Sequence, residues 1–167
     1  MSINITDYID VRLQARALGL NAPTGLAILP RNIAEATRAD ELLHESSATT
    51  LRSLFRQNNI EETRVEKEGQ KIPLIQENEF SLILPIIFVS ASLLSQNPHA
   101  LAIAMNIIAN YATDFFKGIP GSKKVTLDIV VESKSVKGSK RLHYEGPQEG
   151  LEETGKMARK VFDDQSD

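Results

Sequence analysis

One long stretch of this chain carries no charge: Phe80 to Thr113 contains no Asp, Glu, Lys or Arg, although 25% of all residues are charged. Such a gap indicates either a membrane-inserting segment or the core of a folded domain. A transmembrane helix needs about 20 apolar residues. The stretch is divided by Asn97 and Pro98, which is typical of a helix start, and its first part, Phe80–Leu94, is too short to span a bilayer. We therefore expect a helical hairpin at the core of a protein, with membrane insertion of Phe80–Tyr111 as the alternative.

The second arm, Pro98–Lys117, has the pattern of an amphipathic helix. Polar residues including Asn106 and Asn110 fall on one stripe, and Gly118 is suited to end the helix. The apolar arc is wider than one neighbouring element usually covers, and large exposed apolar patches tend to mark interfaces. The sequence therefore predicts contact with a protein partner or a second copy of the chain through Met105, Ile108, Tyr111 and Phe115.

Strands are predicted on both sides of this stretch. The short apolar run Leu26–Leu29 lies between Gly25 and Pro30, as expected of a buried strand. Val125 to Val131 alternates apolar and polar residues, and a second alternating segment carries Leu142 and Tyr144; together they predict a hairpin. A C-terminal helix then follows Gly146 and Pro147, in which Gly150 and Gly155 are expected to lower helix stability.

The N-terminal part is less clearly patterned. Apolar and polar residues alternate over Tyr8–Ala17, which favours a strand. The same segment is rich in residues that favour helices, and Gly19 after it is suited to end a helix, so a helix is the close competitor. Ser46–Arg56 predicts a helix with Arg52 and Arg56 away from its apolar face. Residues 33–44 are interpreted as a loop with one helical turn. The charged segment 58–78 is interpreted as a mobile loop or hairpin, with Ile72–Gln76 as a possible edge strand.

These elements predict one α+β domain over residues 1–167: a central apolar helical hairpin packed on a small mixed or antiparallel sheet, with a C-terminal β-hairpin and helix. Residues 163–167 are expected to form a frayed tail. The expected core comprises Leu84, Ile87, Val89, Leu93, Leu101, Ile108, Leu127 and Ile129.

Charge is distributed unevenly in the C-terminal third. Residues 117–141 contain seven basic and two acidic residues, whereas the chain from residue 145 contains seven acidic and three basic residues. A basic hairpin beside an acidic tail favours docking of an acidic partner or head-to-tail contact between copies. The predicted basic contacts are Lys134, Lys137, Lys140 and Arg141. Nucleic-acid binding is not favoured, because the net charge is −3 and only Tyr144 could stack on a base there.

No catalytic pattern is recognisable. The segment Gly118–Lys124 lacks the order of residues that a phosphate-binding loop requires. Asp40, Glu41, His44 and Glu45 lie close in sequence, but they are interpreted as a solvated acidic face rather than a metal site. We expect no cofactor and no metal, and the chain has no cysteine, which fits a reducing compartment.

The segments ALAIAMNIIANYATDFFKG, KKVTLDIVVE, KRLHYEG and EGLEE, with the earlier LRSLFR, give an order of elements that resembles effector-associated constant component domains. The resemblance covers about two thirds of the chain, and the insertion-like region 58–78 departs from it. It implies a non-enzymatic adaptor that couples a sensor to an effector in bacterial conflict and defence systems.

From these observations we expect a cytoplasmic, non-catalytic interaction module, a regulatory or adaptor component of a bacterial multi-protein system. The first alternative is a membrane-active effector that inserts Phe80–Tyr111, and the second is a small enzyme with an unrecognised site.

Overall fold

The computed structural model describes residues 2–75, 81–121, 123–134 and 138–165. Their elements are, in chain order, β1 (Ser2–Tyr8), α1 (Val11–Ala17), β2 (Leu26–Leu29), a 3₁₀ turn (Ala39–Glu41), α2 (Ala48–Gln57), β3 (Leu82–Ile83), β4 (Ile86–Val89), α3 (Ala91–Gln96), α4 (Ala100–Phe115), β5 (Val125–Glu132), β6 (Ser139–Gly146), a second 3₁₀ turn (Gln148–Gly150) and α5 (Leu151–Asp164). The predicted α+β class is confirmed.

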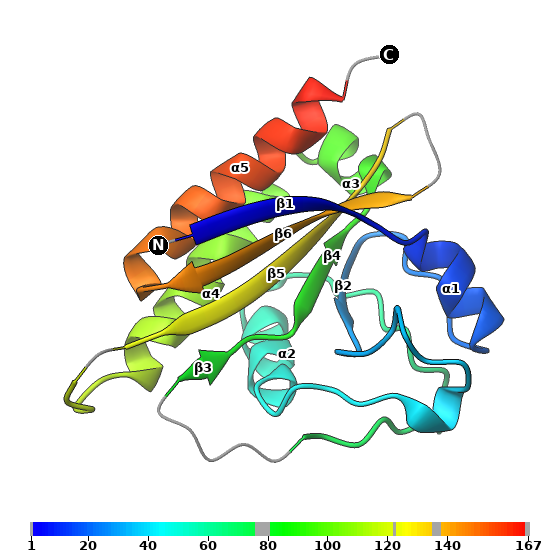
Figure 1. Ribbon diagram of the computed structural model, residues 1–167, viewed down its shortest axis with the longest axis horizontal. Helices are drawn as coiled ribbons and strands as arrows, with labels where there is room; N and C mark the ends of the chain where they lie inside the picture. Colours follow the sequence, from blue (N-terminus) through cyan, green and yellow to red (C-terminus); the bar gives the residue numbers. More distant parts are fainter. Residues whose placement is uncertain (1, 76–80, 122, 135–137, 166–167) are drawn as a thin grey trace.

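The strands form one mixed sheet in the order β1-β6-β5-β4-β2, with β3 paired to β5 as well (Figure 1). β5 is parallel to β3 and β4, because α3 and α4 carry the chain from β4 back to the start of β5. The other pairings are antiparallel, including the predicted hairpin of β5 and β6. Among the described strands, β1 therefore lies at one edge of the sheet, with no strand paired to its outer side.

One face of the sheet is covered by a helical layer. Helices α4 and α5 lie behind the strands in Figure 1, and α2 packs in the same apolar cluster. The sheet contributes alternate residues to this cluster, such as Leu127 and Ile129 of β5 and Leu142 of β6. Of the eight predicted core residues seven are buried, and Leu93 is partly buried against the same cluster.

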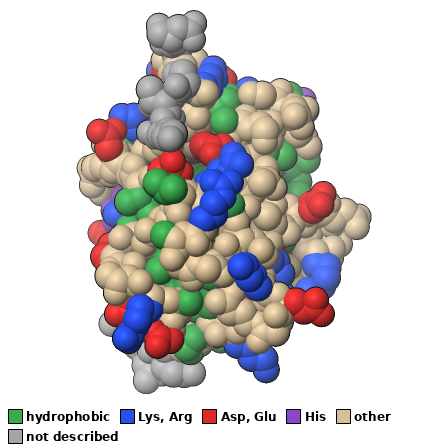
Figure 2. All heavy atoms as spheres, turned by 90° about the vertical axis from the view of Figure 1, so that its right-hand side faces the viewer, with side chains coloured by type: hydrophobic (Ala, Val, Ile, Leu, Met, Phe, Trp, Pro, Cys, Tyr) green, Lys and Arg blue, Asp and Glu red, His purple; other side chains and the backbone are tan. Residues whose placement is uncertain are grey.

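The other face is only half covered. A second apolar cluster forms where α1 and the segment after β2 pack on β2 and β4; it includes Val11, Leu29, Phe88 and Val130. The polar halves of β1, β6 and β5 are not covered by any helix in the described part of the chain. The side of the molecule at the right of Figure 1 carries basic and acidic side chains intermixed, with hydrophobic atoms between them (Figure 2). On the open part of the sheet face, polar side chains such as Thr126 and Asp128 of β5 and Arg141 of β6 are left next to the second cluster.

The predicted helical hairpin was wrong in its first arm. Residues 82–83 and 86–89 are strands, and only the short α3 follows them. All four residues of β4 are buried because both faces of this strand are covered, so its sequence is a continuous apolar run without alternation. Such a run cannot be distinguished from a buried helix by its pattern. Within the described residues, no helix is both long and apolar enough to cross a membrane.

The strand predicted at Tyr8–Ala17 was also wrong, and the competing helix forms instead. The side chain of Asp10 accepts a hydrogen bond from the Leu13 amide (3.1 Å) and starts α1. Gly19, with φ +76°, adopts the left-handed conformation that ends it. The preceding strand β1 was not predicted at all, although Ile3 and Ile5 alternate with polar residues.

Other boundaries differ less. The 3₁₀ turn Ala39–Glu41 supplies the predicted helical turn in the loop 33–44. The possible edge strand Ile72–Gln76 is reduced to one bridge between His44 and Leu74, and Gln76 itself lies outside the described residues. α5 continues to Asp164, so the helix extends into the predicted tail.

Candidate functional site

A polar cavity lies on the open half of the second sheet face. Its volume is about 350 Å³, within the range of about 300–1,000 Å³ for small-molecule pockets. The sheet supplies its floor through Tyr8 at the end of β1, Thr126 and Asp128 of β5, and Arg141 of β6. These side chains share one face because residues two apart on a strand point to the same side.

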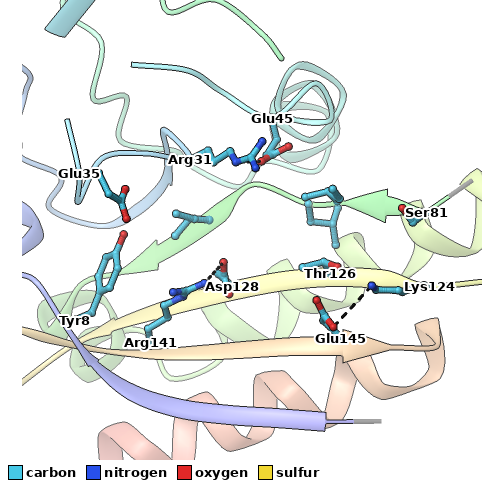
Figure 3. Close-up of a pocket in the computed structure, with 13 residues that line it drawn as sticks. Tyr8, Arg31, Glu35, Glu45, Ser81, Lys124, Thr126, Asp128, Arg141 and Glu145 are labelled. Atoms are coloured by element: carbon cyan, nitrogen blue, oxygen red, sulfur yellow. Dashed lines mark hydrogen bonds and ion pairs between the residues drawn. The ribbon is translucent and has the colours of Figure 1, made fainter. Parts of the chain in front are cut away.

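The wall of the cavity comes from the loop that follows β2. Arg31 donates its backbone amide to Leu43 (2.8 Å). The side chain of Asn32 bridges the same loop: it donates to Glu41 O (2.9 Å) and accepts from the Leu43 amide (3.0 Å). The loop is therefore closed by its own hydrogen bonds, which places Arg31 beside Glu45 over the sheet (Figure 3).

Each basic group at the cavity contacts a carboxylate. Arg141 lies 3.1 Å from Asp128, Arg31 lies 3.6 Å from Glu45, and Lys124 lies 3.8 Å from Glu145 (Figure 3). Opposite charges thus alternate along the recess, and neither sign predominates strongly. Such a surface suits a partner that presents groups of both signs better than it suits a polyanion.

Tyr8 lies at one end of the recess, and its hydroxyl points toward Glu35 (Figure 3). Burial, together with the negative charges of Glu35 and Asp128, raises the pKa of Tyr8 to about 12, although Arg141 opposes this effect. The guanidinium of Arg141 lies 6.0 Å from the centre of the Tyr8 ring. The phenol therefore keeps its proton to a higher pH than an ordinary tyrosine does.

His143 on β6 is the residue at this face closest to a catalytic arrangement. Its Nδ1 lies 2.6 Å from Asp128 and its Nε2 lies 3.5 Å from Glu145. A carboxylate that orients a histidine is part of nucleophilic triads, but there the second ring nitrogen faces a hydroxyl or thiol. Here it faces another carboxylate. The arrangement holds the imidazole in place and does not direct it at a nucleophile.

A second group of charges is buried behind α2. Glu66 contacts His44 (3.0 Å), Arg52 (2.9 Å) and Arg64 (2.9 Å), and Arg52 also contacts Glu62 (2.9 Å). Burial alone would raise the pKa of Glu66, but hydrogen bonds from His44 and Arg52 outweigh it and lower that pKa. Because its carboxylate is shared among three cationic or donor groups, this cluster is a structural tie between α2 and segment 62–66.

Arg52 on α2 contacts the buried carboxylates of Glu62 and Glu66, with its side chain 14% exposed. Near this cluster the structure corrects one interpretation made from the sequence. His44 and Glu45 are also buried, so they are not part of a solvated acidic face. In the described ranges, no group of three or more His, Asp or Glu residues is placed to hold a metal ion.

The predicted partner-binding residues have different environments. Met105 and Ile108 are buried by the chain's own elements, whereas Tyr111 and Phe115 are half-buried beside the core. Partner contact through Tyr111 and Phe115 stays a prediction, while Met105 and Ile108 serve the internal core. Burial of Ile108 was expected from the sequence. Burial of Met105 was not, because Gly155 of α5, which lies against it, comes from far along the chain.

The basic hairpin is largely engaged within the molecule. Lys140 forms an ion pair with Asp7 of β1. The ammonium group of Lys134 lies 4.6 Å from the centre of the Phe162 ring in α5. Arg141 lines the polar cavity, and Lys137 lies outside the described residues. Of the basic residues predicted from the sequence, Arg141 is therefore the one that the structure places at the candidate site.

The other residues of the site were not found from the sequence. Tyr8, Arg31, Glu35 and Thr126 are distant along the chain and belong to no motif. A signal was present in β5, where Thr126 and Asp128 fall on the polar side of the predicted alternation, opposite the apolar face.

A less polar recess of about 510 Å³ lies between α4 and α5, with Leu101 and Met105 among its lining residues and Lys156 and Arg159 from α5. Arg159 is held by the carbonyl of Leu94 (2.7 Å) and by Asp163 (3.2 Å). This recess is separate from the polar cavity, since the sheet lies between them.

No family model matches the chain, and neither the curated proteins nor the solved structures contain a match. The resemblance to effector-associated constant component domains therefore rests only on the order of elements along this chain.

Proposed function

We propose that this chain is a non-catalytic interaction module that binds a protein partner on the open face of its sheet. The observation that carries the proposal is the uncovered polar surface of β1, β6 and β5, which contains a recess bordered by alternating charges. Protein interfaces commonly place one large anchoring side chain in such a recess and surround it with polar contacts.

The charge pattern describes the partner. Arg31, Lys124 and Arg141 can donate hydrogen bonds to carboxylates of the partner, while Glu35 and Glu145 can accept them from its lysine or arginine side chains. The ion pairs already formed in the recess hold these side chains in place before binding, so little side-chain freedom is lost when the complex forms. A partner surface of mixed charge therefore fits better than nucleic acid.

The resemblance described above supports a more specific role, that of an adaptor in a bacterial multi-protein defence system. The rival membrane-active role rested on a helical hairpin over Phe80–Tyr111, and residues 82–83 and 86–89 are strands instead. The rival enzymatic role finds its closest arrangement at His143, whose two ring nitrogens face carboxylates.

The test uses a partner identified by stoichiometric co-purification from the source cells and then purified separately. Thr126→Arg places a long side chain into the recess without removing an ion pair, since Thr126 lines the floor. Thr113→Arg makes the same chemical change on the exposed surface of α4. We expect Thr126→Arg to weaken binding of the purified partner at least tenfold and Thr113→Arg to leave it within twofold.

Equal effects of the two substitutions would overturn the proposal, and so would the failure of every co-purified protein to re-form the complex from pure components. Thermal unfolding of both variants verifies that a loss of binding does not come from unfolding.

A further inference from the structure

The unpaired edge of β1 has a feature that the proposed open-face function does not use. β1 pairs with β6 from Ser2↔Glu145 to Tyr8↔Ser139 and has no strand on its other side among the described segments. Exposed strand edges offer a row of free amides and carbonyls and are usually protected by lysine, proline or a bulge. The residues Ser2–Thr6 contain none of these residues, and Ile5 is 45% exposed.

The sequence of this edge is nearly the same in both directions. Around Asn4, Ile occupies both neighbouring positions, and a hydroxyl residue, Ser2 or Thr6, occupies both positions beyond. In an antiparallel pair of identical strands related by a two-fold axis through Asn4, Ile3 lies opposite Ile5 of the other copy and Ser2 lies opposite Thr6. Asn4 lies opposite its own counterpart. Like chemistry thus meets like chemistry at every position.

The faces of the sheet permit this register. Residues directly opposite one another on antiparallel strands point to the same face, and a two-fold axis perpendicular to the sheet preserves the faces. Ile3 packs against the cluster under α4 and α5, so Ile3, Ile5 and their two counterparts would meet on the helical side. A shift by one residue would place Ile5 opposite Asn4 and mix the faces, which a half-buried strand does not tolerate.

The pairing also fits the existing charges. Asp7 lies outside the five-residue register and keeps its ion pair with Lys140. Asn4, Ile5 and Thr6 carry no charge, so two copies do not repel each other along the edge.

We propose that the β1 edge binds a second copy of this chain, in an antiparallel pair centred on Asn4. The two sheets then form one continuous sheet in which β1 of one copy lies beside β1 of the other, and the two polar open faces lie on the same side. The contact is short and smaller than a standard interface of about 1,600 Å², so association is expected at micromolar concentrations.

The first test is sedimentation equilibrium of the purified chain from about 1 to 500 µM, a range set by the weak association expected of small interfaces. Ile5→Lys places charges at the centre of the contact, and it should shift the dissociation constant at least tenfold toward the monomer. Leu13→Lys is the matched control, because Leu13 is 60% exposed on α1, away from this edge, and it should dimerise like the wild type. A wild-type chain that stays monomeric throughout, or equal effects of the two substitutions, would overturn the proposal.

The second test measures the register. The chain has no cysteine, so a single introduced thiol reports only its own neighbours. Under mild oxidation Asn4→Cys should form a covalent dimer, since the two Cβ atoms would lie about 4.5–5.5 Å apart. Ser2→Cys alone should not, whereas a mixture of Ser2→Cys and Thr6→Cys should form the mixed dimer. Covalent dimers of Ser2→Cys alone as abundant as those of Asn4→Cys would contradict the register. These tests need no other protein, so their failure is distinct from a failure of the open-face function.

Discussion

Gly155 of α5 lies directly against Met105 of α4. A Cβ atom added at Gly155 would lie 2.6 Å from the Cγ of Met105 and 3.2 Å from its Cβ. Such distances are shorter than side-chain contacts allow, and they involve the inner atoms of the Met105 side chain, whose positions follow the backbone of α4. The sequence suggested that this glycine weakens α5; its place in the fold shows that it permits the close approach of the two helices.

Gly155→Ala is therefore expected to destabilise the protein. Helix propensity alone would add about 1 kcal/mol of stability, whereas overpacking a core costs about 1–3 kcal/mol. We expect the free energy of unfolding in urea to fall by about 1 kcal/mol. Adding Met105→Ala should remove most of the penalty caused by the alanine at 155, and strictly additive effects, or a stabilised Gly155→Ala variant, would contradict this contact.

Ile108 and Asn110 provide a test of the α4 faces. Ile108 is fully buried, whereas Asn110 is exposed. Ile108→Glu would bury an unpaired charge and is expected to lower the free energy of unfolding by at least about 4 kcal/mol. Asn110→Glu should change it by less than about 0.5 kcal/mol. If Ile108→Glu kept the thermal midpoint of the wild type, the placement of this side chain in the core would be wrong.

Glu66 should make the protein sensitive to acid. Its pKa in the folded chain is lowered from an ordinary value of 4.5, because hydrogen bonds from His44 and Arg52 outweigh the effect of burial. A carboxyl group of this kind stabilises the folded state above the unfolded pKa, and the contribution is lost as the pH falls below about 4.5. Urea unfolding between pH 7 and pH 3 measures this loss.

Glu66→Gln is the variant that isolates this contribution. It leaves Arg52 with one carboxylate instead of two and should cost about 3 kcal/mol at pH 7. Below pH 4.5 the difference from the wild type should shrink. A difference that stayed constant from pH 7 to pH 3 would mean that the Glu66 carboxylate is not stabilised in the folded state.

Tyr8 gives the opposite dependence at high pH. Burial, with the charges of Glu35 and Asp128, raises its pKa to about 12 from an ordinary value of 10.0. The unfolded chain thus releases this proton first, and stability is lost as the pH rises from about 10 toward 12. Tyr8→Phe should flatten the fall of the unfolding free energy measured between pH 9 and pH 11; an unchanged slope would contradict the burial of this phenol.

The sequence was informative where one face of an element is exposed. The alternation of β5 and β6 and the stripe of α4 each follow a single period, and their predictions agree with the structure. It was misleading where both faces are covered: Ile86, Ile87 and Phe88 form a continuous run because one cluster lies on each side of β4. α1 was misjudged because Val11, Ala15 and Leu18 share a helical face, while the intervening Leu13 imitates alternation and is exposed.

The candidate site was harder to predict for a different reason. Its side chains come from β1, the loop after β2, β5 and β6, and only the sheet order brings these segments together. Arg141 was singled out through its charge, but its partner Asp128 and the neighbouring Tyr8 have no sequence signal that links them. Contacts across a mixed sheet depend on the order of its strands, which local patterns do not encode.

The most direct test of the account is a nuclear magnetic resonance titration of the labelled chain with its purified partner. We expect the largest shift changes on the open face, at Thr126, Arg141 and His143, with no change at Asn110 on the exposed side of α4. Changes confined to α4, at Asn110 and Tyr111, with Thr126 and Arg141 unaffected, would contradict the proposal that the partner binds the open face of the sheet.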